Sequence, residues 1–537
     1  MYSTVFQISC FTIALIAAVA YMFMEFRRDL TMLQQNSYRN DRYMRWLKAS
    51  GDTTSVMRLL SVAVVLAGVS TLSVPMVSMI LVFIVSITGV IKLGAMRYKK
   101  PLVMTHRAWR IYGVMTAIAL AVITGAYFMF GGERSVLHGQ LVVALSALAL
   151  YCASHIVTMA AVWMLQPVER SINARYRRDA ERILASMPDL RIIGITGSYG
   201  KTSTKHYLNR ILSEKYDTLM TPGNFNTTLG VIRTVREHLK PYNEVFIVEM
   251  GAKQAGDIAD ICRLVHPEAG IITAVGPQHL ESFKTIENVQ ATKFELADAL
   301  PADGLAVLNQ DFPYIASREI INASAERYTV NDTPGAGWRV TDITYGTDGT
   351  RFTLNGPGGY SINLRTRLVG ECNISNLAAA VIMARHMGVE DDRIRYAVEQ
   401  IEQVEHRLNL KRTPAGITII DDAYNSNPAG SAMALDVLAG MTGGKRIVVT
   451  PGMVELGTRQ YELNAAFGEK IAAAADIAVV VNRANRDAIT EGAMRAGMPE
   501  TSIRKVESFA EAQAVLATML APGDTVLYEN DLPDTFK

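Results

Sequence analysis

The chain has 537 residues, which is enough for three or four domains. Its formal net charge of +2 gives no support for a nucleic-acid partner, and its four cysteines show no zinc-binding spacing. Hydrophobic residues make up 49% of the chain and charged residues 19%, with the hydrophobic excess concentrated in the first third. That uneven distribution excludes an ordinary soluble protein and indicates a membrane region.

Apolar runs in the first third predict about five transmembrane helices, because each is long enough to cross a bilayer. The predicted spans are residues 4–24, two spans within 59–94, residues 111–130 and residues 138–165. Val74-Pro75 marks the expected hairpin within the double run. A cleaved signal peptide is the alternative for the first run. The absence of a basic segment before it and the apolar runs that follow argue against that alternative.

The basic residues alternate along this region in a way that predicts orientation. Lys and Arg cluster after the first, third and fifth spans and are nearly absent from the two loops between, where Arg134 is the exception. The positive-inside rule then places the N-terminus outside and everything after residue 165 in the cytoplasm. We therefore expect a multi-pass protein of the cell membrane. The spans carry no acidic residue apart from Glu25 at one end, which favours an anchor over a transporter.

Residues 191–205, RIIGITGSYGKTSTK, predict a nucleotide-binding loop. A β-branched run leads into a glycine-rich turn and a helix start, an arrangement that cradles phosphate. Lys201 would contact the β- and γ-phosphates, and the Thr202 hydroxyl would bind Mg²⁺. The spacing, G-x-T-G-x-x-G-K-T, departs from the common P-loop, and an ordinary turn with a surface lysine is the alternative. The expected loop residues are Gly197, Ser198, Gly200, Lys201, Thr202 and Ser203.

Strands and helices alternate after this loop, which is typical of a doubly wound parallel sheet. The expected elements are strands at 191–197, 244–250, 269–275 and 304–308 and helices at 201–215, 256–265 and 287–300. Ligands bind beyond the carboxyl ends of such strands. Glu249 closes the second strand as a candidate Mg²⁺ ligand, and His279 follows the third as a candidate for a second metal or a phosphate. An isolated loop histidine would otherwise be a surface residue.

The remaining sequence predicts further elements and a second α/β domain. Residues 328–368 indicate a small antiparallel insertion, and residues 370–388 a helix opened by Asn373 and Asn376. We therefore expect an α-helical transmembrane region, then a central doubly wound parallel-sheet domain resembling an ATPase, then a smaller Rossmann-like α/β domain. The expected boundaries are 1–165 for the membrane region, 166–190 for a connector, 191–401 for the central domain and 402–537 for the C-terminal domain.

Over most of residues 190–460 the sequence resembles the Mur ligases, and most closely the members that add D-alanyl-D-alanine. These ATP-dependent enzymes join an amino acid or peptide to a peptidoglycan precursor. The matching motifs, in order, are GITGSYGKTST, TPGNFNTTLG, VEMGAKQAGDI, PQHLESF, ATKFEL, GECNISNLAAA, DDAYNSNP and GMVELG. The order of so many motifs makes the resemblance specific.

The resemblance implies ATP and Mg²⁺ as cofactors, and it implies roles for matching positions. Glu249 and His279 would hold a second Mg²⁺ with Lys293, which falls where several Mur ligases carry a carbamylated lysine. The implied nucleotide positions are Asn376 at the adenine, Asp422 at the ribose, Arg407 at the γ-phosphate and Tyr424 near the nucleotide or the amine. The implied substrate positions are Asn226 and Asn425, and the implied catalytic residues are Lys201, Lys293, His279 and Arg407.

The sequence also departs from the family pattern. Tyr199 stands where the phosphate loop usually has a small or amide residue, and Cys372 replaces a histidine. Membrane spans replace the N-terminal UDP-sugar domain, which argues against a soluble UDP-linked acceptor. We therefore expect a membrane-anchored amide ligase with a small-molecule or lipid-linked cell-wall precursor as its partner. The alternatives are a synthase of a polymer such as poly-γ-glutamate, and an ATP-driven transporter or regulator that uses the ligase fold.

Overall fold

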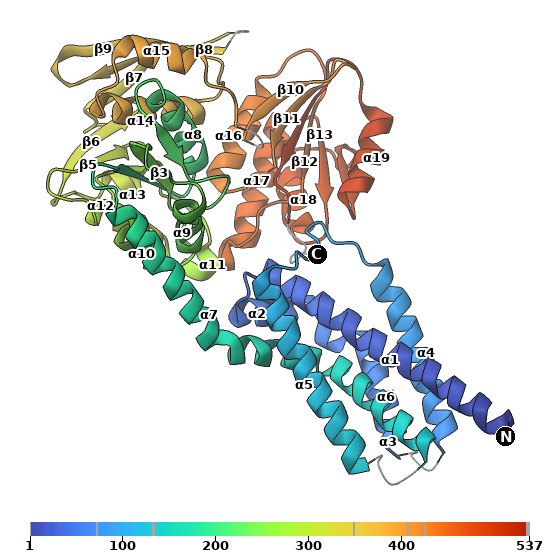
Figure 1. Cartoon of the computed structure of the whole chain (residues 1–537). Coiled ribbons are helices and arrows are strands. Elements are labelled where there is room, and N and C mark those ends of the chain that lie inside the picture. The colour runs from blue at the N-terminus through green and yellow to red at the C-terminus, as the bar shows by residue number, and fades with distance from the viewer. Residues whose placement is uncertain are drawn as a thin grey trace. The chain divides into compact units, whose positions relative to one another are not determined.

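A computed structural model describes residues 2–70, 74–130, 135–346, 349–404, 407–423 and 426–532 (Figure 1). The chain forms two compact units. The first extends to Ile172 and includes Leu532, and the second comprises residues 173–531. The first unit is helical and the second is α/β, which confirms the fold class expected from the sequence.

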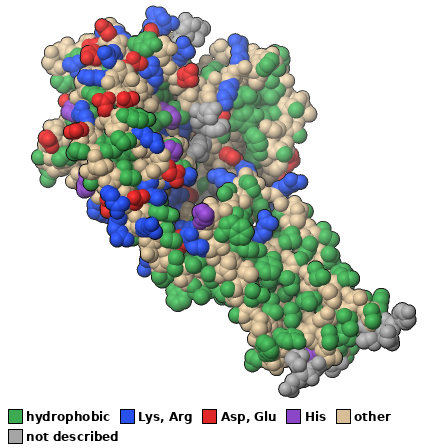
Figure 2. Space-filling model, viewed as in Figure 1, with side chains coloured by type: hydrophobic (Ala, Val, Ile, Leu, Met, Phe, Trp, Pro, Cys, Tyr) green, Lys and Arg blue, Asp and Glu red, His purple; other side chains and the backbone are tan. Residues whose placement is uncertain are grey.

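The first unit is a bundle of helices around one apolar core. Its helices are α1 (Tyr2–Gln35), α2 (Asn40–Ser50), η1 (Asp52–Thr54), α3 (Val56–Ser70), α4 (Pro75–Ala95), α5 (His106–Phe130), α6 (Val136–Cys152) and the first part of α7 (Ser154–Ala185). Large apolar side chains, including Leu66, Ile91 and Phe128, are exposed on the outside of the bundle, and Figure 2 shows hydrophobic side chains covering these helices. Such a surface is typical of helices in lipid.

Among the described residues, three helices are long and apolar enough to cross a membrane, namely α1, α4 and α5. The pair α6 and α7 is bent by 74° and gives a fourth if it is one broken span. The sequence predicted five. Helix α3 lies where the second span was expected, and its 15 described residues extend about 22 Å of a hydrocarbon core of about 30 Å. Helix α7 also continues through most of the expected connector as one helix.

A buried group of charged side chains fastens the helices of the first unit together. Helix α1 extends past the expected end of its span, and it buries Asp29 as well as Glu25. Arg58 of α3 donates to the Glu25 carboxylate at 2.7 Å. His155 of α7 lies between two carboxylates, with Nδ1 3.1 Å from Asp29 and Nε2 3.0 Å from Asp52. No local pattern in the sequence predicts this group, because its members come from four separate elements.

Replacement of His155 by Gln should destabilise the full-length protein by about 3–5 kcal/mol, the usual cost of removing one partner from a buried charged pair. The change leaves Asp29 and Asp52 without the ring that separates them. Thermal unfolding in detergent would measure it, with His106→Gln at an exposed position as the matched control. Equal melting temperatures for the two variants would contradict the stabilising role of this group.

The second unit begins with the end of α7 and a nine-stranded sheet. Its strands are β1 (Arg191–Thr196), β2 (Thr218–Met220), β3 (Val245–Glu249), β4 (Ala269–Ile272), β5 (Leu305–Asn309), β6 (Ser324–Thr329), β7 (Trp338–Gly346), β8 (Gly349–Gly356) and β9 (Tyr360–Thr366). The order is β2-β3-β1-β4-β5-β6-β7-β8-β9, parallel up to β7 and antiparallel from β7 to β9. The expected antiparallel insertion therefore continues the central sheet.

Helices cover both faces of this sheet, as the alternating pattern predicted. They are α8 (Lys201–Leu212), α9 (Thr228–Glu237), α10 (Asp257–Val265), α11 (Leu280–Phe283), α12 (Ile286–Asp298), α13 (Pro313–Ala316), α14 (Glu371–His386) and α15 (Asp391–Glu399), with η2 (Pro357–Gly359) between β8 and β9. Alternate residues of β1 and β3 pack against α8 and α14 on one face and against α9, α10 and α12 on the other. Asn373 and Asn376 were expected to open α14, but the helix begins earlier, after Gly370, and both lie inside it.

A second, six-stranded sheet has the order β10-β11-β15-β12-β13-β14. Its elements are β10 (Asn409–Arg412), β11 (Thr418–Asp422), α16 (Pro428–Ala439), β12 (Arg446–Thr450), η3 (Gly457–Arg459), α17 (Gln460–Ala474), β13 (Ile477–Val481), α18 (Arg486–Arg495), η4 (Glu500–Ser502), β14 (Ile503–Val506), α19 (Phe509–Met519) and β15 (Thr525–Glu529). All pairings are parallel except β10 with β11. This is the second α/β domain that the sequence predicted.

Candidate functional site

The register of the central sheet brings three chain segments to one edge. Strand β1 lies between β3 and β4, and Ile195 pairs with Glu249 while Thr196 pairs with Ile272. The glycine-rich loop after β1 therefore lies beside the last residue of β3 and the segment that follows β4. This is the carboxyl edge, where parallel α/β sheets bind ligands.

The glycine-rich loop has the backbone of a phosphate cradle. Gly200 has φ +79° and precedes α8, and a Cβ at this position would lie 2.2 Å from Oδ1 of Asn376. Lys201 begins α8, and its Nζ donates to the carbonyls of Gly197 (2.6 Å) and Ser198 (3.3 Å). Burial lowers the pKa of Lys201 to about 8, with Glu249 opposing the shift. The lysine side chain thus folds over the loop and binds its backbone carbonyls. A bound anion would attract the ammonium more strongly than these carbonyls do.

Tyr199, the bulky residue of this loop, points beneath it. Its ring is buried, and its hydroxyl donates to the carbonyl of Pro277 at 3.1 Å. Its own carbonyl accepts a hydrogen bond from Thr273. A Cβ at Gly276 would lie 2.4 Å from the Tyr199 hydroxyl, so only a glycine at position 276 leaves space for the tyrosine ring. The departure from a small residue therefore fastens the loop to the segment that leads to His279.

Glu249 is buried but well supplied with partners. Its Oε1 accepts from the Asn226 amide at 3.0 Å, and its Oε2 lies 3.1 Å from Nζ of Lys205. Burial opposes ionisation, but Lys205, Lys201 and the Asn226 hydrogen bond hold the pKa of Glu249 below its usual value. Its Oε2 is buried and accepts no hydrogen bond of good geometry. An ionised carboxylate with one oxygen that accepts no hydrogen bond is a suitable Mg²⁺ ligand.

His279 lies at the same edge in a left-handed conformation, with φ +51°. Its Nδ1 contacts the Glu455 carboxylate, and Lys253 Nζ lies 3.3 Å from that carboxylate. Burial lowers the pKa of His279 and Glu455 opposes the shift, whereas His279 and Lys253 overcome burial and lower the pKa of Glu455 to about 2. With Nδ1 engaged, Nε2 of a neutral ring is the atom that could bind a metal.

Lys293 of α12 is 1% exposed, and among the described residues no hydrogen bond or ion pair forms with its amine. Burial lowers the pKa of Lys293 well below its usual value, and the charge of Lys201 acts in the same direction. Burial therefore favours the neutral form of this amine over the ammonium. A neutral amine is the nucleophilic form of a lysine.

The predicted nucleotide positions are partly brought together. Asn376 of α14 lies against Gly200, as the loop geometry showed. Asp422 closes β11, and burial raises its pKa to about 6 while Arg407 opposes the shift. The charge of Arg407 also lowers the pKa of Lys201, so these three groups share one electrostatic environment. The predicted roles of Tyr424 and Asn425 lie outside the described residues.

The other loop positions have the following placement. Thr202 is half-buried in the first turn of α8, and Ser203 is buried one position later. Ser198 Oγ donates to the Gly276 carbonyl at 3.1 Å. This contact joins the loop to the segment that follows β4.

Sequence reasoning missed two residues, Lys205 and Glu455. Lys205 follows Lys201 by four positions, so helical periodicity places both on one face of α8. That spacing was a usable signal. Glu455 belongs to the motif GMVELG, but nothing in the local sequence indicates its contact with His279, which is 176 residues away.

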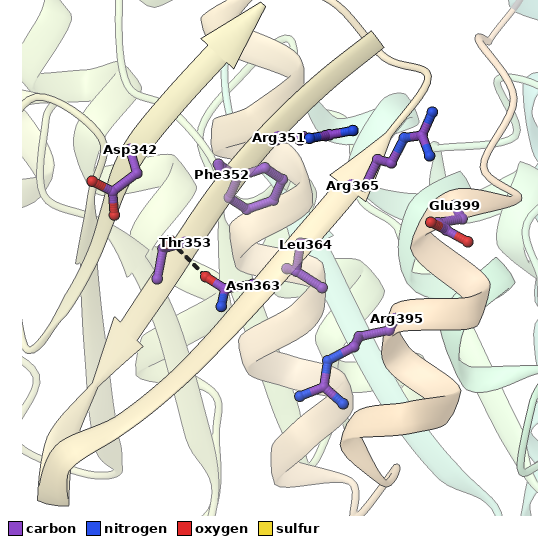
Figure 3. A pocket seen from close by; sticks show the side chains of 9 residues that line it. All are labelled: Asp342, Arg351, Phe352, Thr353, Asn363, Leu364, Arg365, Arg395 and Glu399. Atoms are coloured by element: carbon purple, nitrogen blue, oxygen red, sulfur yellow. Dashed lines mark hydrogen bonds between the residues drawn. The ribbon is translucent and has the colours of Figure 1, made fainter. Parts of the chain in front are cut away.

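A shallow pocket of 370 Å³ lies elsewhere in the second unit, on the antiparallel strands β7 to β9 and helix α15 (Figure 3). Arg351 and Arg365 line it from the strands, and Arg395 and Glu399 line it from the helix. None of the predicted site residues lines this pocket, so it is distinct from the edge that carries Lys201 and Glu249.

Comparison with known proteins identifies the family. Residues 195–384 match the Mur ligase middle domain, and residues 406–528 match the Mur ligase, glutamate ligase domain. The UDP-N-acetylmuramoyl-tripeptide–D-alanyl-D-alanine ligase of Mycobacterium bovis is 30% identical over 362 residues, which cover 63% of this chain and 70% of that protein. The chain belongs to the Mur ligase family. The resemblance found in the motifs is thereby confirmed.

Two further similarities concern the same part of the chain. The protein of the same name in Escherichia coli (strain K12) is 32% identical over 286 residues, which are 53% of this chain and 62% of the length of that relative. The MurF ligase from Thermotoga maritima, solved in complex with ADP, gives a TM-score of 0.59 at 25% identity and covers 67% of this chain and 80% of that chain. Both similarities leave the remainder of this chain without a counterpart in the alignment.

Replacement of Gly200 by Ala should weaken nucleotide binding by at least about tenfold. The left-handed φ costs a Cβ roughly 1–2 kcal/mol, and the contact with Asn376 adds to that cost. Titration with a fluorescent ATP analogue would measure the effect. Gly497→Ala is the matched control, since its φ is +94° but a Cβ there would meet no atom within 4 Å. Equal affinities in the two variants would exclude the loop as the nucleotide site.

Proposed function

We propose that this chain is a membrane-anchored, ATP-dependent amide ligase of the Mur type. The observation that carries the proposal is the geometry at one sheet edge, where Lys201 folds over a glycine loop and the buried Glu249 closes the neighbouring strand, with the buried Lys293 near the charge of Lys201. The glycine loop with Lys201 can bind phosphate, Glu249 can bind a metal ion, and Lys293 can be modified to support that ion. Together these groups suit phosphoryl transfer from ATP to a carboxylate. Membership of the Mur ligase family supports the same reaction.

The reaction has two balanced steps. A substrate carboxylate oxygen attacks the γ-phosphorus of ATP, the bond to the β–γ bridging oxygen breaks, and ADP leaves with formation of an acyl phosphate. The nitrogen of an amine then attacks the acyl carbon, phosphate leaves, and the nitrogen loses a proton to give the amide. Lys201 stabilises charge on the transferring phosphoryl group, and Arg407 adds a second positive charge in the same environment.

The residues present fit Mg²⁺. Thr202 would hold one ion, and Glu249 and His279 would hold a second; when bound, Mg²⁺ neutralises charge on the phosphates. Lys293 as an amine is a poor metal ligand, but its neutral nitrogen can attack CO₂, forming a carbamate and releasing one proton. The carbamate would supply oxygen donors for the ion that Glu249 and His279 would hold. Burial without a hydrogen-bonding partner favours the neutral amine, which is the form that this modification requires.

Lys293→Ala should therefore lower ligase activity by about 10–100-fold, the usual effect of losing support around a metal. Removal of bicarbonate and CO₂ should lower wild-type activity as well, and added short-chain carboxylic acids should partly restore the variant. Turnover by coupled ADP release would measure both effects. A fully active variant, with a wild type indifferent to bicarbonate, would exclude carbamylation.

The substrates are proposed from two features. The relatives are named for a D-alanyl-D-alanine ligation onto a UDP-N-acetylmuramoyl-tripeptide, which supports a cell-wall peptide carboxylate and an amino-acid or dipeptide amine here. The three long apolar helices support attachment to the cell membrane with the catalytic domains in the cytoplasm, and with it a lipid-linked carboxylate. A polymer synthase of the poly-γ-glutamate type is the second candidate, since membrane attachment also suits a polymer made for export.

The decisive test incubates membranes containing the full chain with ATP, Mg²⁺, D-alanyl-D-alanine and either lipid-linked or UDP-linked peptide precursors. Mass spectrometry should find a new amide and an equal amount of ADP, and Lys201→Ala should lower the yield by about 10²–10³-fold. A glutamate polymer instead would favour the second candidate. ATP hydrolysis that consumes neither carboxylate nor amine would replace the ligase with a transporter or regulator.

A further inference from the structure

Lys205 is a fully buried lysine that no part of the proposed reaction uses. It lies on α8, one helical turn after Lys201, and its side chain is 0% exposed. A buried ammonium is costly unless each of its three N–H groups finds an acceptor. Acceptors for the Lys205 ammonium must therefore lie close to its nitrogen.

Three oxygens surround the Lys205 ammonium. Nζ donates to the carbonyls of Thr221 at 2.9 Å and Gly223 at 2.7 Å, and it lies 3.1 Å from Oε2 of Glu249. The ammonium thus has two hydrogen-bond acceptors and one ion-pair partner. Both acceptors belong to the turn after β2, and the ion-pair partner is the candidate metal ligand at the end of β3.

The turn after β2 also contacts Glu249 directly, through Asn226. The amide of Asn226 donates to Oε1 of Glu249 at 3.0 Å, and the carbonyl of Asn226 accepts from the N–H of Gly251 at 2.7 Å. Thr221 Oγ1 also accepts from the N–H of Glu249 at 3.1 Å. The two carboxylate oxygens are thus held by two groups that are themselves tied to the same turn.

We propose that Lys205 is a positioning residue that locks the turn formed by residues 221–226 to Glu249, so that order in the turn and metal binding at Glu249 depend on each other. This inference rests on the proposed function for the identity of the metal site. The contacts of the Lys205 ammonium are to the turn and to Glu249. It acts by fixing the carboxylate that would bind Mg²⁺ and the turn that carries Asn226, the residue expected toward the substrate.

Two opposing effects make the sign of the result informative. A purely electrostatic lysine would repel a divalent cation, so its removal would tighten metal binding at Glu249. A positioning lysine would do the reverse, because without it the carboxylate and the turn lose their fixed geometry. Lys205→Met keeps the length and apolar stem of the side chain and removes the ammonium, and it therefore separates the two roles.

The experiment uses the full chain in detergent, with Mn²⁺ as the probe and a non-hydrolysable ATP analogue. Lys205→Met should weaken Mn²⁺ binding, measured by electron paramagnetic resonance, by about tenfold. In the metal-free protein, hydrogen exchange of the peptide 217–227 should become faster. Lys215→Met, at an exposed position shortly after the same helix, is the matched control and should change neither quantity. Tighter Mn²⁺ binding, or unchanged binding and exchange, would overturn the proposal.

A second variant covers the case in which Lys205→Met does not fold. Asn226 is only half-buried, so Asn226→Ala removes the other contact to Glu249 at little risk to the core. Asn226→Ala should also weaken Mn²⁺ binding and speed hydrogen exchange in the turn. The absence of both effects would overturn the proposed coupling between the turn and Glu249. If the wild-type chain binds nucleotide but fails to bind Mn²⁺, the metal site and the proposed function are both overturned. The exchange data would still show whether Lys205 holds the turn.

Discussion

The placement of β1 between β3 and β4 is the constraint on which the site depends. It aligns Ile195 with Glu249, so the glycine loop and the carboxylate end at the same edge. Two glycines in these strands leave space for helix α12. A Cβ at Gly194 would lie 2.5 Å from the Leu296 side chain, and a Cβ at Gly270 would lie 3.0 Å from the same side chain. Helix α12 can therefore approach the sheet closely. Lys293 lies one turn earlier on the same helix and is carried to the loop by that close packing.

Much of the second unit could be predicted from the sequence, because its signals are local. Apolar strands, glycine turns and helix starts alternate, and polar residues follow the strand ends, which places Lys201, Glu249 and His279 at one edge by topology alone. The contacts of Lys205 and Glu455 could not be predicted in the same way. The spacing from Lys201 indicates the helix face of Lys205, but no local pattern identifies the partners of either residue, which lie in other segments of the chain. The start of α14 was misjudged because Asn373 has a common capping side chain, although inside the helix it bonds to Val369 and Tyr207.

The first unit shows the same division between local and long-range information. Hydropathy indicates where apolar helices lie, but it does not give their ends, and α1 continues to Gln35 because Glu25 and Asp29 find partners inside the bundle. Those partners come from α3 and α7, more than thirty and more than a hundred residues away. A count of spans made from apolar runs alone therefore treats these acidic residues as the end of a helix. Packing makes them part of its interior.

Two buried lysines show how the same side chain acquires different chemistry in one site. Lys205 has three oxygens around its nitrogen, one of them a carboxylate, so burial is offset and the ammonium can fix its surroundings. Lys293 has no such partner and lies within reach of the Lys201 charge, so burial favours its neutral form. In the sequence, both are lysines on helices near acidic residues. The difference between a group that holds the site in place and a group that can react is set by the acceptors that the fold delivers to each nitrogen.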